Sequence, residues 1–465
     1  MFRFQMGWLA ALITAILFLP IELFAAPLDK IKTVIVIYGE NRSFDNLYGL
    51  FPGADGIEAA MKSGAYRQVD RDGKELEALP PVWKKDGAPD PRFPAGLPNA
   101  PFRIDAPPVN LGLDIETPDP VHKFYQNREQ IDGGKNDKFA AISNVGALVM
   151  GYYDGSRLPL WKLAQQYTLA DNFFMGAFGG SFLNHFWLIC ACTPIFPDAP
   201  PTLFPKLDVD GKLVKKADGP PKFADGAVTP DGFAVNTLQP PYPPSGSSKD
   251  PPLPPQTEKT IGDTLSAKGI SWKWYSGGWN RALADPTVIY NDGKVNFQPH
   301  HQPFNYFARF APGTKDRKLH LKDEADLLQD IARNRLPQVS FYKPQGEFNE
   351  HPGYADVLSG DEHIANLIAK LQASRQWKHM VIIVTYDENG GFWDHVAPPV
   401  GDRWGPGTRI PAIIISPYAK KGYVDHTLYD TTSILKFLAE RFHLEPLQGV
   451  RAYGDLTNAF DFSGK

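Results

Sequence analysis

Cysteine is almost absent from this sequence, which has only two, Cys190 and Cys192, in 465 residues. The sequence contains no cysteine constellation typical of a zinc site. Both cysteines lie on an expected helix, where positions i and i+2 point to different sides. We therefore expect two buried free thiols rather than a strained disulfide, although an exported protein could pair them.

A surplus of basic residues is also missing. The formal net charge is −4 at pH 7, which gives no electrostatic reason to expect nucleic acid as a partner. Long apolar runs are missing beyond the first 26 residues, so no later segment is expected to span a membrane. Nothing in the sequence sets the oligomeric state.

The extended apolar stretch near the start, residues 8–19, follows Arg3 and precedes Ala25-Ala26. A short basic region, an apolar core of this length and small residues after it are typical of a secretory signal peptide. We predict that residues 1–26 are such a signal peptide, with an uncleaved membrane anchor as the alternative. The mature protein is then expected to be periplasmic or secreted.

Proline and glycine, in contrast, are abundant, with 44 and 41 residues. Two long stretches, 78–120 and 194–257, are rich in proline and break the pattern of the remaining chain. Loops of this length are usually functional excursions or disordered. We interpret them as insertions into one catalytic domain, residues 27–465, where they form a lid or cap over the edge of a sheet. A linker between domains is the alternative for such proline-rich segments.

Apolar, β-branched segments alternate with segments of helical periodicity along the chain. The expected strands are 33–38, 270–275, 338–343, 379–386 and 410–416, and the expected helices are 157–166, 182–191, 260–268, 321–334, 361–374 and 431–441. Continuous apolar strands are typical of parallel sheets that are buried on both faces. The alternation with helices predicts an α/β fold with a mainly parallel central sheet flanked by helices.

Two acidic clusters, Glu40-Asn41 and Asp387-Glu388, directly follow the first and the fourth of these strands. Ligands of open α/β sheets bind beyond the carboxyl ends of the strands. Oxygen-rich side chains at two such ends predict one site for a hard cation. Adjacent carboxylates diverge on an extended strand, so both reach one ion only if the strand has ended by Asp387. The two glycines that soon follow favour such an end.

A third informative segment, residues 179–185, reads Gly-Gly-Ser-Phe-Leu-Asn-His. The glycines permit a tight turn and the close approach of a substrate to the backbone. Ser181 would then lie at or near a helix N-terminus, where free N–H groups and the dipole favour a bound anion. Two interpretations stay open, a plain N-cap and a nucleophile that faces a phosphate. The Gly-x-Ser-x-Gly turn of the α/β-hydrolases is absent, so a Ser-His-Asp triad is not indicated.

Four of the eleven histidines, His122, His300, His301 and His351, lie among turn residues. Each of them alone is more often a structural or surface residue. Their joint occurrence favours a phosphate pocket. Adjacent residues on a strand point to opposite faces, so His300 and His301 need not both reach it.

Together these segments resemble the bacterial phosphoesterase family that contains the non-specific phospholipases C and a group of exported acid phosphatases. The matching motifs are Gly39–Asp45, Gly180-Ser181 with Asn184-His185, Thr385–His395, Ser416-Pro417-Tyr418, Tyr423–His426 and Asp430–Ile434. Their order and joint presence carry the resemblance, because each motif alone is weak or moderate. The Gly-Gly-Ser form resembles the acid phosphatase branch more, since a threonine commonly replaces this serine in the phospholipase branch.

The resemblance implies an alkaline-phosphatase-like α/β fold, one divalent metal ion and a serine nucleophile at Ser181. The implied metal ligands are Glu40, Asn41, Ser181, Asp387 and Glu388. The histidines implied to bind phosphate or transfer protons are His122, His300, His301 and His351. Ligation by oxygen atoms suits Ca²⁺, Mg²⁺, Mn²⁺ or iron better than a thiolate-rich zinc site does.

The resulting prediction is an exported, metal-dependent acid phosphatase that hydrolyses small phosphomonoesters through a phosphoserine intermediate. The alternative within enzymes is a phospholipase C that cleaves the phosphodiester of phospholipids, because the same metal and nucleophile could serve both reactions. The alternative from another class is a non-catalytic exported module that binds structural calcium. The Gly-Gly-Ser turn argues against such a module, since a structural ion needs no nucleophile.

Overall fold

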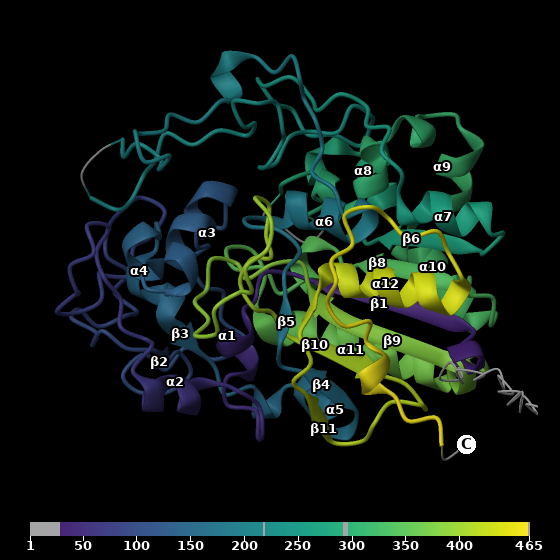
Figure 1. Ribbon diagram of the computed structural model, residues 1–465, viewed down its shortest axis with the longest axis horizontal. Coiled ribbons are helices and arrows are strands. Elements are labelled where there is room, and N and C mark those ends of the chain that lie inside the picture. Colours follow the sequence, from purple (N-terminus) through teal and green to yellow (C-terminus); the bar gives the residue numbers. More distant parts are fainter. Residues whose placement is uncertain (1–27, 217–218, 292–295, 464–465) are drawn as a thin grey trace, which may run out of the picture.

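An eight-stranded β-sheet forms the centre of the protein in the computed structural model, which describes residues 28–216, 219–291 and 296–463 (Figure 1). The strands of this sheet are β1 (Thr33–Gly39), β4 (Thr168–Ala170), β6 (Trp272–Ser276), β7 (Leu321–Asp323), β8 (Val339–Lys343), β9 (Met380–Tyr386), β10 (Ala412–Ile415) and β11 (Tyr423–Asp425). They lie in the order β11-β4-β10-β9-β1-β8-β6-β7. All neighbours are parallel except β10, which is antiparallel to both β9 and β4.

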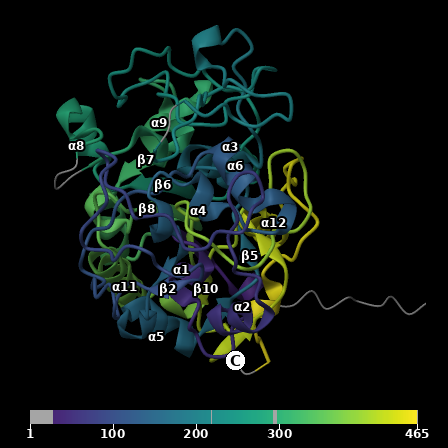
Figure 2. The ribbon, with the colours of Figure 1, turned by 90° about the vertical axis from the view of Figure 1, so that its left-hand side faces the viewer.

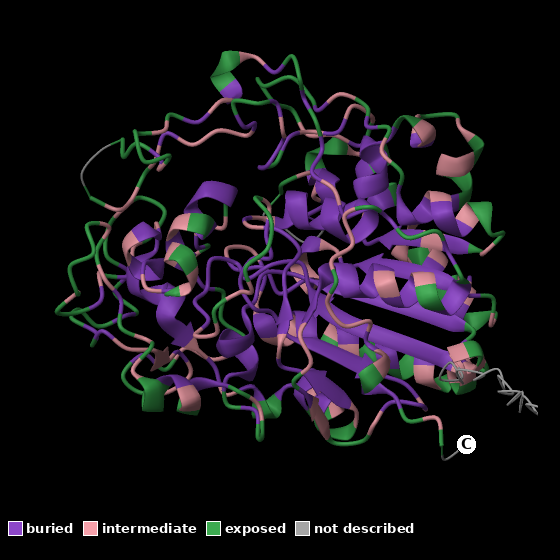
Figure 3. Cartoon of the chain, in the orientation of Figure 1, coloured by how far each residue is buried: buried purple, intermediate pink, exposed green. Residues whose placement is uncertain are grey.

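The strands β1 and β9 lie inside the sheet, and every residue of both is buried (Figure 3). Burial on both faces explains why their sequences are continuous apolar runs rather than alternating ones. All five predicted strands are confirmed, and so is the predicted α/β class with a mainly parallel sheet. The three strands of this sheet that were not predicted, β4, β7 and β11, have three residues each and are too short to show a period.

Helices cover both faces of the sheet. The α-helices of the described chain are α1 (Phe44–Tyr48), α2 (Ile57–Ser63), α3 (Phe124–Ile131), α4 (Phe139–Ile142), α5 (Pro159–Gln166), α6 (Ser181–Cys190), α7 (Ile261–Ala267), α8 (Trp279–Ala284), α9 (Lys315–His320), α10 (Glu324–Ala332), α11 (Val357–Ala373) and α12 (Thr431–Phe442). Helix α6 packs against α7 and α12, whereas α5 packs against α11. Figure 2 shows α11 and α12 on opposite sides of the sheet.

A helix is present at each of the six predicted positions, with two notable differences at the boundaries. Helix α11 begins at Val357, four residues early, because the side chain of Asp356 accepts a hydrogen bond from Ser359 N and caps it. The segment expected as a helix over 321–334 opens as β7, and α10 starts only after Asp323, which caps it.

Two small parallel sheets lie outside the central one. The first pairs β2 (Phe102–Arg103) with β3 (Gly151–Tyr152), and the second pairs β5 (Phe173–Phe174) with β12 (Tyr429–Asp430). Helices α1 to α4 gather with β2 and β3 at the left of Figure 1, beside the sheet. No helix in the part of the chain that the structure describes is long and apolar enough to cross a membrane. The predicted signal peptide, residues 1–26, lies outside the described residues.

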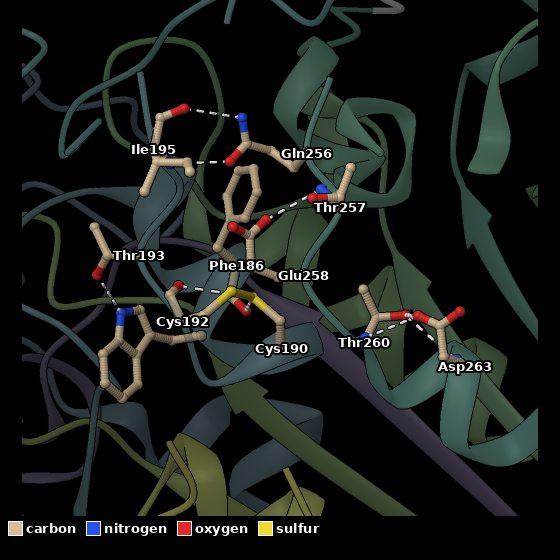
Figure 4. Close-up of a disulfide and its surroundings, with 11 residues drawn as sticks. Phe186, Cys190, Cys192, Thr193, Ile195, Gln256, Thr257, Glu258, Thr260 and Asp263 are labelled. Carbon is tan, nitrogen blue, oxygen red and sulfur yellow. Dashed lines mark hydrogen bonds between the residues drawn. A yellow bond between two sulfur atoms is a disulfide. The ribbon is translucent and has the colours of Figure 1, made fainter. Parts of the chain in front are cut away.

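The proline-rich segment 194–257 arches over the top of the molecule in Figure 1 (teal). Its described part is held by isolated bridges such as Leu207 with Leu213, rather than by long strands or α-helices. Its two ends meet at one point. The side-chain amide of Gln256 accepts a hydrogen bond from Ile195 N at 2.9 Å and donates one to Ile195 O at 3.0 Å (Figure 4).

The prediction of two free thiols is wrong, because Cys190 and Cys192 form a disulfide (Figure 4). The prediction assumed that both residues lie on a helix. Helix α6 ends at Cys190, and Ala191 adopts a left-handed conformation with φ 47°. The chain therefore turns between the two cysteines, and their Cα atoms lie 5.1 Å apart, within the range that a disulfide can bridge.

Candidate functional site

The candidate site lies where β1 and β9 end side by side. The two strands are parallel neighbours, with Gly39 opposite Tyr386 at their carboxyl ends. The next residues of both strands are consequently in contact, and Asn41 N donates to Asp387 Oδ1 at 3.3 Å. Because β9 ends at Tyr386, the backbone is no longer extended at Asp387 and Glu388.

A left-handed turn on each side brings the two loops together. The φ angle is 68° at Asn41 and 61° at Gly390. A Cβ atom on Gly390 would lie 2.4 Å from the carbonyl oxygen of Asn41. Asparagine tolerates positive φ, whereas a contact this close requires glycine. The glycine after the second acidic cluster therefore has a geometric cause.

Glu40 is fully buried and has several hydrogen-bond donors. Its Oε1 lies 2.8 Å from His301 Nε2, and its Oε2 accepts hydrogen bonds from Asn349 Nδ2 and from Tyr354 OH. Burial alone would raise the pKa of Glu40, but His301 and Lys343 outweigh it and hold the pKa well below its usual range. Glu40 is therefore an anion in the interior.

Lys343, the last residue of β8, brings a buried positive charge to the site. Its Nζ donates to Asp387 Oδ2 at 3.2 Å and to the carbonyl of Gly39 at 3.1 Å, and lies 3.8 Å from Glu40 Oε2. Sequence reasoning missed this residue. The available signal was its position, since it ends a predicted apolar strand just as the acidic clusters do.

Asp387 and Glu388 turn in different directions. Asp387 contacts Asn41 and Lys343, whereas Glu388 Oε2 accepts from Gly390 N at 2.5 Å. Glu388 Oε1 is buried without a hydrogen-bond partner, 3.8 Å from His122 Nε2. Burial raises the pKa of both carboxyls, and the neighbouring carboxylates raise it further, against the opposite pull of Lys343 on Asp387 and of His122 on Glu388.

These features fit a bound cation. Three buried carboxyl groups in one place need a counter-charge, and an unpartnered carboxylate oxygen such as Glu388 Oε1 is an available ligand. In the described chain, the groups of histidine and carboxylate ligand atoms within 4.8 Å of one another are Glu40 with His300 and His301, Asp119 with His122 and His351, and Asp45 with Asp394 and His395. The first group adds imidazole nitrogens to the oxygen donors, so the donor set alone does not identify the metal.

Ser181 opens helix α6, and Gly180 is the N-cap. The interpretation of Ser181 as a plain N-cap therefore does not hold. Its hydroxyl lies beside Asn41, to whose Oδ1 it donates at 3.3 Å. A Cβ atom on Gly179 would lie 2.4 Å from Phe124 N, and one on Gly180 would lie 2.7 Å from the His122 carbonyl. The two glycines thus let the 122–124 backbone approach the serine.

Three of the four predicted histidines share a pocket with Ser181. This pocket has a volume of about 330 Å³, and His122, His300 and His351 line it. The Nδ1 atoms of His122 and His351 each lie within hydrogen-bond distance of a backbone carbonyl. Burial lowers the pKa of His300 and His351. It also opposes charge on His122, but the carboxylates of Glu388 and Asp119 raise that pKa to about 9.

His301 does not line the pocket. Its Nε2 contacts the carboxylate of Glu40 instead. It lies with His300 in a short 3₁₀ turn rather than on a strand. Their rings are nearly perpendicular, at 81°, so both reach the site from different sides. His185 was not predicted. Its ring stacks on His301 at 5.5 Å, and its Nδ1 lies 2.7 Å from the Ser181 carbonyl, so it supports the first turn of α6.

The proline-rich segment supplies the roof of the pocket. Its residues Leu203, Asp225, Asn236 and Asp250 line the same cavity as Ser181. Asn236 is fixed there, because its Oδ1 accepts from Phe124 N at 3.0 Å and its Nδ2 donates to the Gly226 carbonyl at 2.7 Å. The roof thus contributes polar and apolar residues, and two carboxylates, those of Asp225 and Asp250, are among those that line the pocket.

A buried ionic network supports the two acidic loops from below. Arg409 donates from Nε to Asp394 Oδ1 at 2.9 Å and from Nη2 to Asp45 Oδ1 at 3.1 Å. His395 Nδ1 lies 2.6 Å from Asp45 Oδ2. Asp45 belongs to the first loop, and Asp394 and His395 belong to the second. The network therefore ties together the segments that carry Asn41 and Glu388.

Several known proteins are similar to this chain. Residues 31–445 match the sequence profile described as "Phosphoesterase family". "Phospholipase C B" of Mycobacterium tuberculosis is 26% identical over 94% of this chain and 78% of its own length. "Phospholipase C A" of the same organism is 28% identical with the same coverage. A solved protein of the alkaline phosphatase superfamily from Vibrio parahaemolyticus overlaps 77% of this chain and 75% of its own, with 12% identity and a TM-score of 0.35.

Proposed function

Because the chain belongs to the Phosphoesterase family and is therefore a phosphoric ester hydrolase, we propose that it hydrolyses phosphomonoesters through a phosphoserine intermediate on Ser181. The family membership confirms the resemblance that the motifs indicated. The observation that carries the proposal is the position of Ser181, at the first residue of α6 and in the wall of a pocket with three histidines. Family membership also argues against the non-catalytic calcium-binding module.

Ser181 is suited to attack a phosphate because of where it lies. The first turn of a helix leaves N–H groups without partners inside the helix, and the helix dipole favours an anion there. Phosphoryl oxygens placed above Ser181 are therefore stabilised by the same backbone that holds the attacking oxygen. The bond from Ser181 Oγ to phosphorus forms as the bond to the leaving oxygen breaks.

The proposed metal ligands are Glu40, Asn41, Ser181, Asp387 and Glu388. When bound there, a divalent cation lowers the pKa of a serine hydroxyl and neutralises charge on phosphoryl oxygens. Glu40 and Asp387 are held in place by His301, Asn349 and Lys343. Water then hydrolyses the phosphoserine and frees Ser181.

The leaving oxygen needs a proton, and His122 and His351 are the proposed donors. Both line the pocket, and the carbonyl contacts of their Nδ1 atoms leave Nε2 for the substrate. Loss of the donor should slow an alkyl phosphate at least about tenfold more than p-nitrophenyl phosphate, because nitrophenolate leaves without a proton. Measuring kcat/KM of H122N and H351N on both substrates checks this. Equal losses on both substrates in both variants would contradict the assignment.

The test of the nucleophile is Ser181→Ala. We expect activity on p-nitrophenyl phosphate to fall at least about a thousandfold, because the covalent route is lost. Ser181→Thr is the matched control, since it retains a hydroxyl and should retain measurable turnover. A phosphopeptide containing Ser181 should be recovered by mass spectrometry from acid-quenched wild-type enzyme. Near-normal turnover by a folded Ser181→Ala protein would remove Ser181 from this role.

A second candidate function is a phospholipase C reaction on phospholipids. It is favoured by the names of the two Mycobacterium tuberculosis relatives, which align over 94% of this chain. The serine at position 181 favours phosphomonoesters instead, because it resembles the acid phosphatase branch. Comparison of kcat/KM on p-nitrophenyl phosphate and p-nitrophenyl phosphorylcholine separates the two, and a preference for the diester would reverse the order of the candidates.

We also infer that the protein works in the periplasm or outside the cell. The disulfide between Cys190 and Cys192 supports this location, because disulfides persist mainly in oxidising compartments. N-terminal sequencing of the protein recovered from the periplasm or medium should give a start close to residue 27. Recovery of the whole chain in the cytoplasm would contradict the inference.

A further inference from the structure

Lys343 is the buried lysine of the site, and the proposed chemistry uses it only to hold Asp387 in place. It is fully buried, and its ammonium group lies between two of the proposed metal ligands, 3.2 Å from Asp387 Oδ2 and 3.8 Å from Glu40 Oε2. A third contact, 3.1 Å to the carbonyl of Gly39, fixes it at the end of β1. Burying a lysine is costly unless it is paired, so these contacts define its place.

The charges around Lys343 suggest what it does. Glu40, Asp387 and Glu388 are buried carboxyl groups with a joint charge of −3 when ionised, and one ammonium group reduces this to −2. His122 faces Glu388 at 3.8 Å, but a carboxylate of its own, Asp119, lies 3.5 Å from its other nitrogen. A single divalent ion neutralises a residual charge of −2. A trivalent ion would leave an uncompensated positive charge in a low-dielectric interior.

We propose that Lys343 sets the charge of the metal ion that this site accepts. By cancelling one of three carboxylate charges and separating Glu40 from Asp387, it makes the site selective for a divalent over a trivalent ion. It is a positioning residue, because it contacts the proposed ligands rather than the substrate. The inference rests on the proposed function through the metal ligands named there.

The experiment measures ion selectivity rather than activity. Chelator-treated wild-type protein and Lys343→Met are titrated with Mn²⁺, followed by electron paramagnetic resonance, and with Tb³⁺, followed by luminescence. The ratio of the two dissociation constants should shift towards Tb³⁺ in Lys343→Met by on the order of tenfold or more, because a nearby positive charge repels the trivalent ion more strongly. An unchanged ratio in the folded variant overturns the proposal.

Two controls match this variant. Lys343→Arg keeps the charge and should keep the wild-type ratio. Lys273→Met removes a lysine of the neighbouring strand β6 that pairs with Asp330 instead, and it should also leave the ratio unchanged. A shift in Lys273→Met as large as in Lys343→Met overturns the proposal, because general destabilisation would then explain both.

A second variant covers the case in which Lys343→Met does not fold. Lys343→Met combined with Asp387→Asn removes both partners of the buried pair and restores the residual charge of −2. It should therefore regain the wild-type preference for Mn²⁺, and a preference for Tb³⁺ in this double variant overturns the proposal. If wild-type protein binds neither ion stoichiometrically, the proposed metal site itself fails. If it binds Mn²⁺ and the ratio of the two dissociation constants is the same with lysine and with methionine at position 343, only the inference about Lys343 fails.

Discussion

At the scale of the residue, the interior of this protein contains several charged side chains in contact with one another, which is unusual. Arg409 is almost fully buried and contacts two aspartates, Asp45 and Asp394. His395 adds a second cation to the same network, at 2.6 Å from Asp45 and 3.1 Å from Asp55. Such groups are costly to bury alone and stable only as a set. Their protonation is therefore coupled to folding.

His395 gives a prediction about alkaline pH. Burial opposes its charge, but hydrogen bonding and attraction to Asp45 outweigh burial and raise its pKa to about 9. Its folded pKa lies above the ordinary value of about 6.5, so its stabilisation is fully present below about 6.5 and is lost as the pH rises through about 9. The whole difference corresponds to about 3 kcal/mol in the free energy of unfolding.

His395→Gln should therefore be less stable than wild type near pH 6 and similar to it near pH 10. Urea unfolding of both proteins from pH 6 to pH 10 measures this convergence. His379→Gln is the control, because its ring contacts the hydroxyl of Tyr418 rather than a carboxylate. A stability gap between wild type and His395→Gln that stays constant with pH would contradict the prediction.

Part of the candidate site was proposed from the sequence at this scale, and the roles of its residues stay predictions. The acidic clusters follow strand ends, Ser181 follows two glycines, and the pocket histidines lie among turn residues. Such local signals are visible in a sequence. Lys343 and His185 were missed because their importance depends on partners more than 40 residues away, such as Asp387 for Lys343 and His301 for His185. The position of Lys343 at the end of a predicted strand was a local sign, but the contacts themselves leave no pattern in the sequence.

At the scale of the element, the loop after β9 determines how the two halves of the site meet. Gly390 has a φ of 61° and packs against the backbone of Asn41, with no room for a Cβ atom. Gly269 has a similar φ of 68° but has nothing within 4 Å of a Cβ atom. The two glycines differ in steric surroundings and hardly in conformation, so they form a matched pair.

Gly390→Ala should reduce both stability and activity, whereas Gly269→Ala should reduce stability alone. The conformational cost is about 1 kcal/mol at either position, and the clash at Gly390 adds to it by pushing Asn41 away from Ser181. Thermal unfolding and kcat/KM on p-nitrophenyl phosphate measure the two effects. If both variants lost activity to the same extent, the close contact with Asn41 would have no role in the site.

Elements also explain where prediction from sequence succeeds and where it fails. The buried strands β1 and β9 have seven residues each, long enough for their largely apolar, β-branched sequences to be recognised. The disulfide could not be predicted, because it depends on α6 ending at Cys190. The left-handed conformation of Ala191 cannot be recognised from the sequence, since alanine is a typical helix residue. Helix ends are set by capping contacts, and these are the least visible part of a sequence.

At the scale of the whole molecule, the proposed metal ion should contribute to stability as well as to activity. A ligand that binds only the folded state stabilises it by about 2.7 kcal/mol at a concentration a hundred times its dissociation constant. Chelation should lower the thermal midpoint and abolish phosphate release, and one class of added ion should restore both. Calorimetry, elemental analysis and the phosphatase assay on the same samples check this.

Glu388→Gln provides the comparison for that experiment. It removes one of the buried carboxylate charges and leaves an amide oxygen, so the difference between ion-loaded and ion-free protein should shrink. Full activity and an unchanged thermal midpoint in wild-type protein that elemental analysis shows to be metal-free would contradict a role for the ion. The α/β class of the whole molecule was predictable from alternating segments. A lid over the edge of the sheet was also expected from 194–257, but its position over Ser181 was not predictable, because proline-rich sequence carries no period.

The hydrogen bonds between Gln256 and Ile195 close the base of this proline-rich segment. The chain leaves the body of the protein and returns to it at the same place, so the strands beneath need not move when the length or composition of the segment changes. Such an arrangement lets the substrate preference change independently of the reaction that the site catalyses. Residues of the roof can therefore be substituted, inserted or deleted, and the preference for a substrate altered, without displacing Ser181 or the acidic loops below.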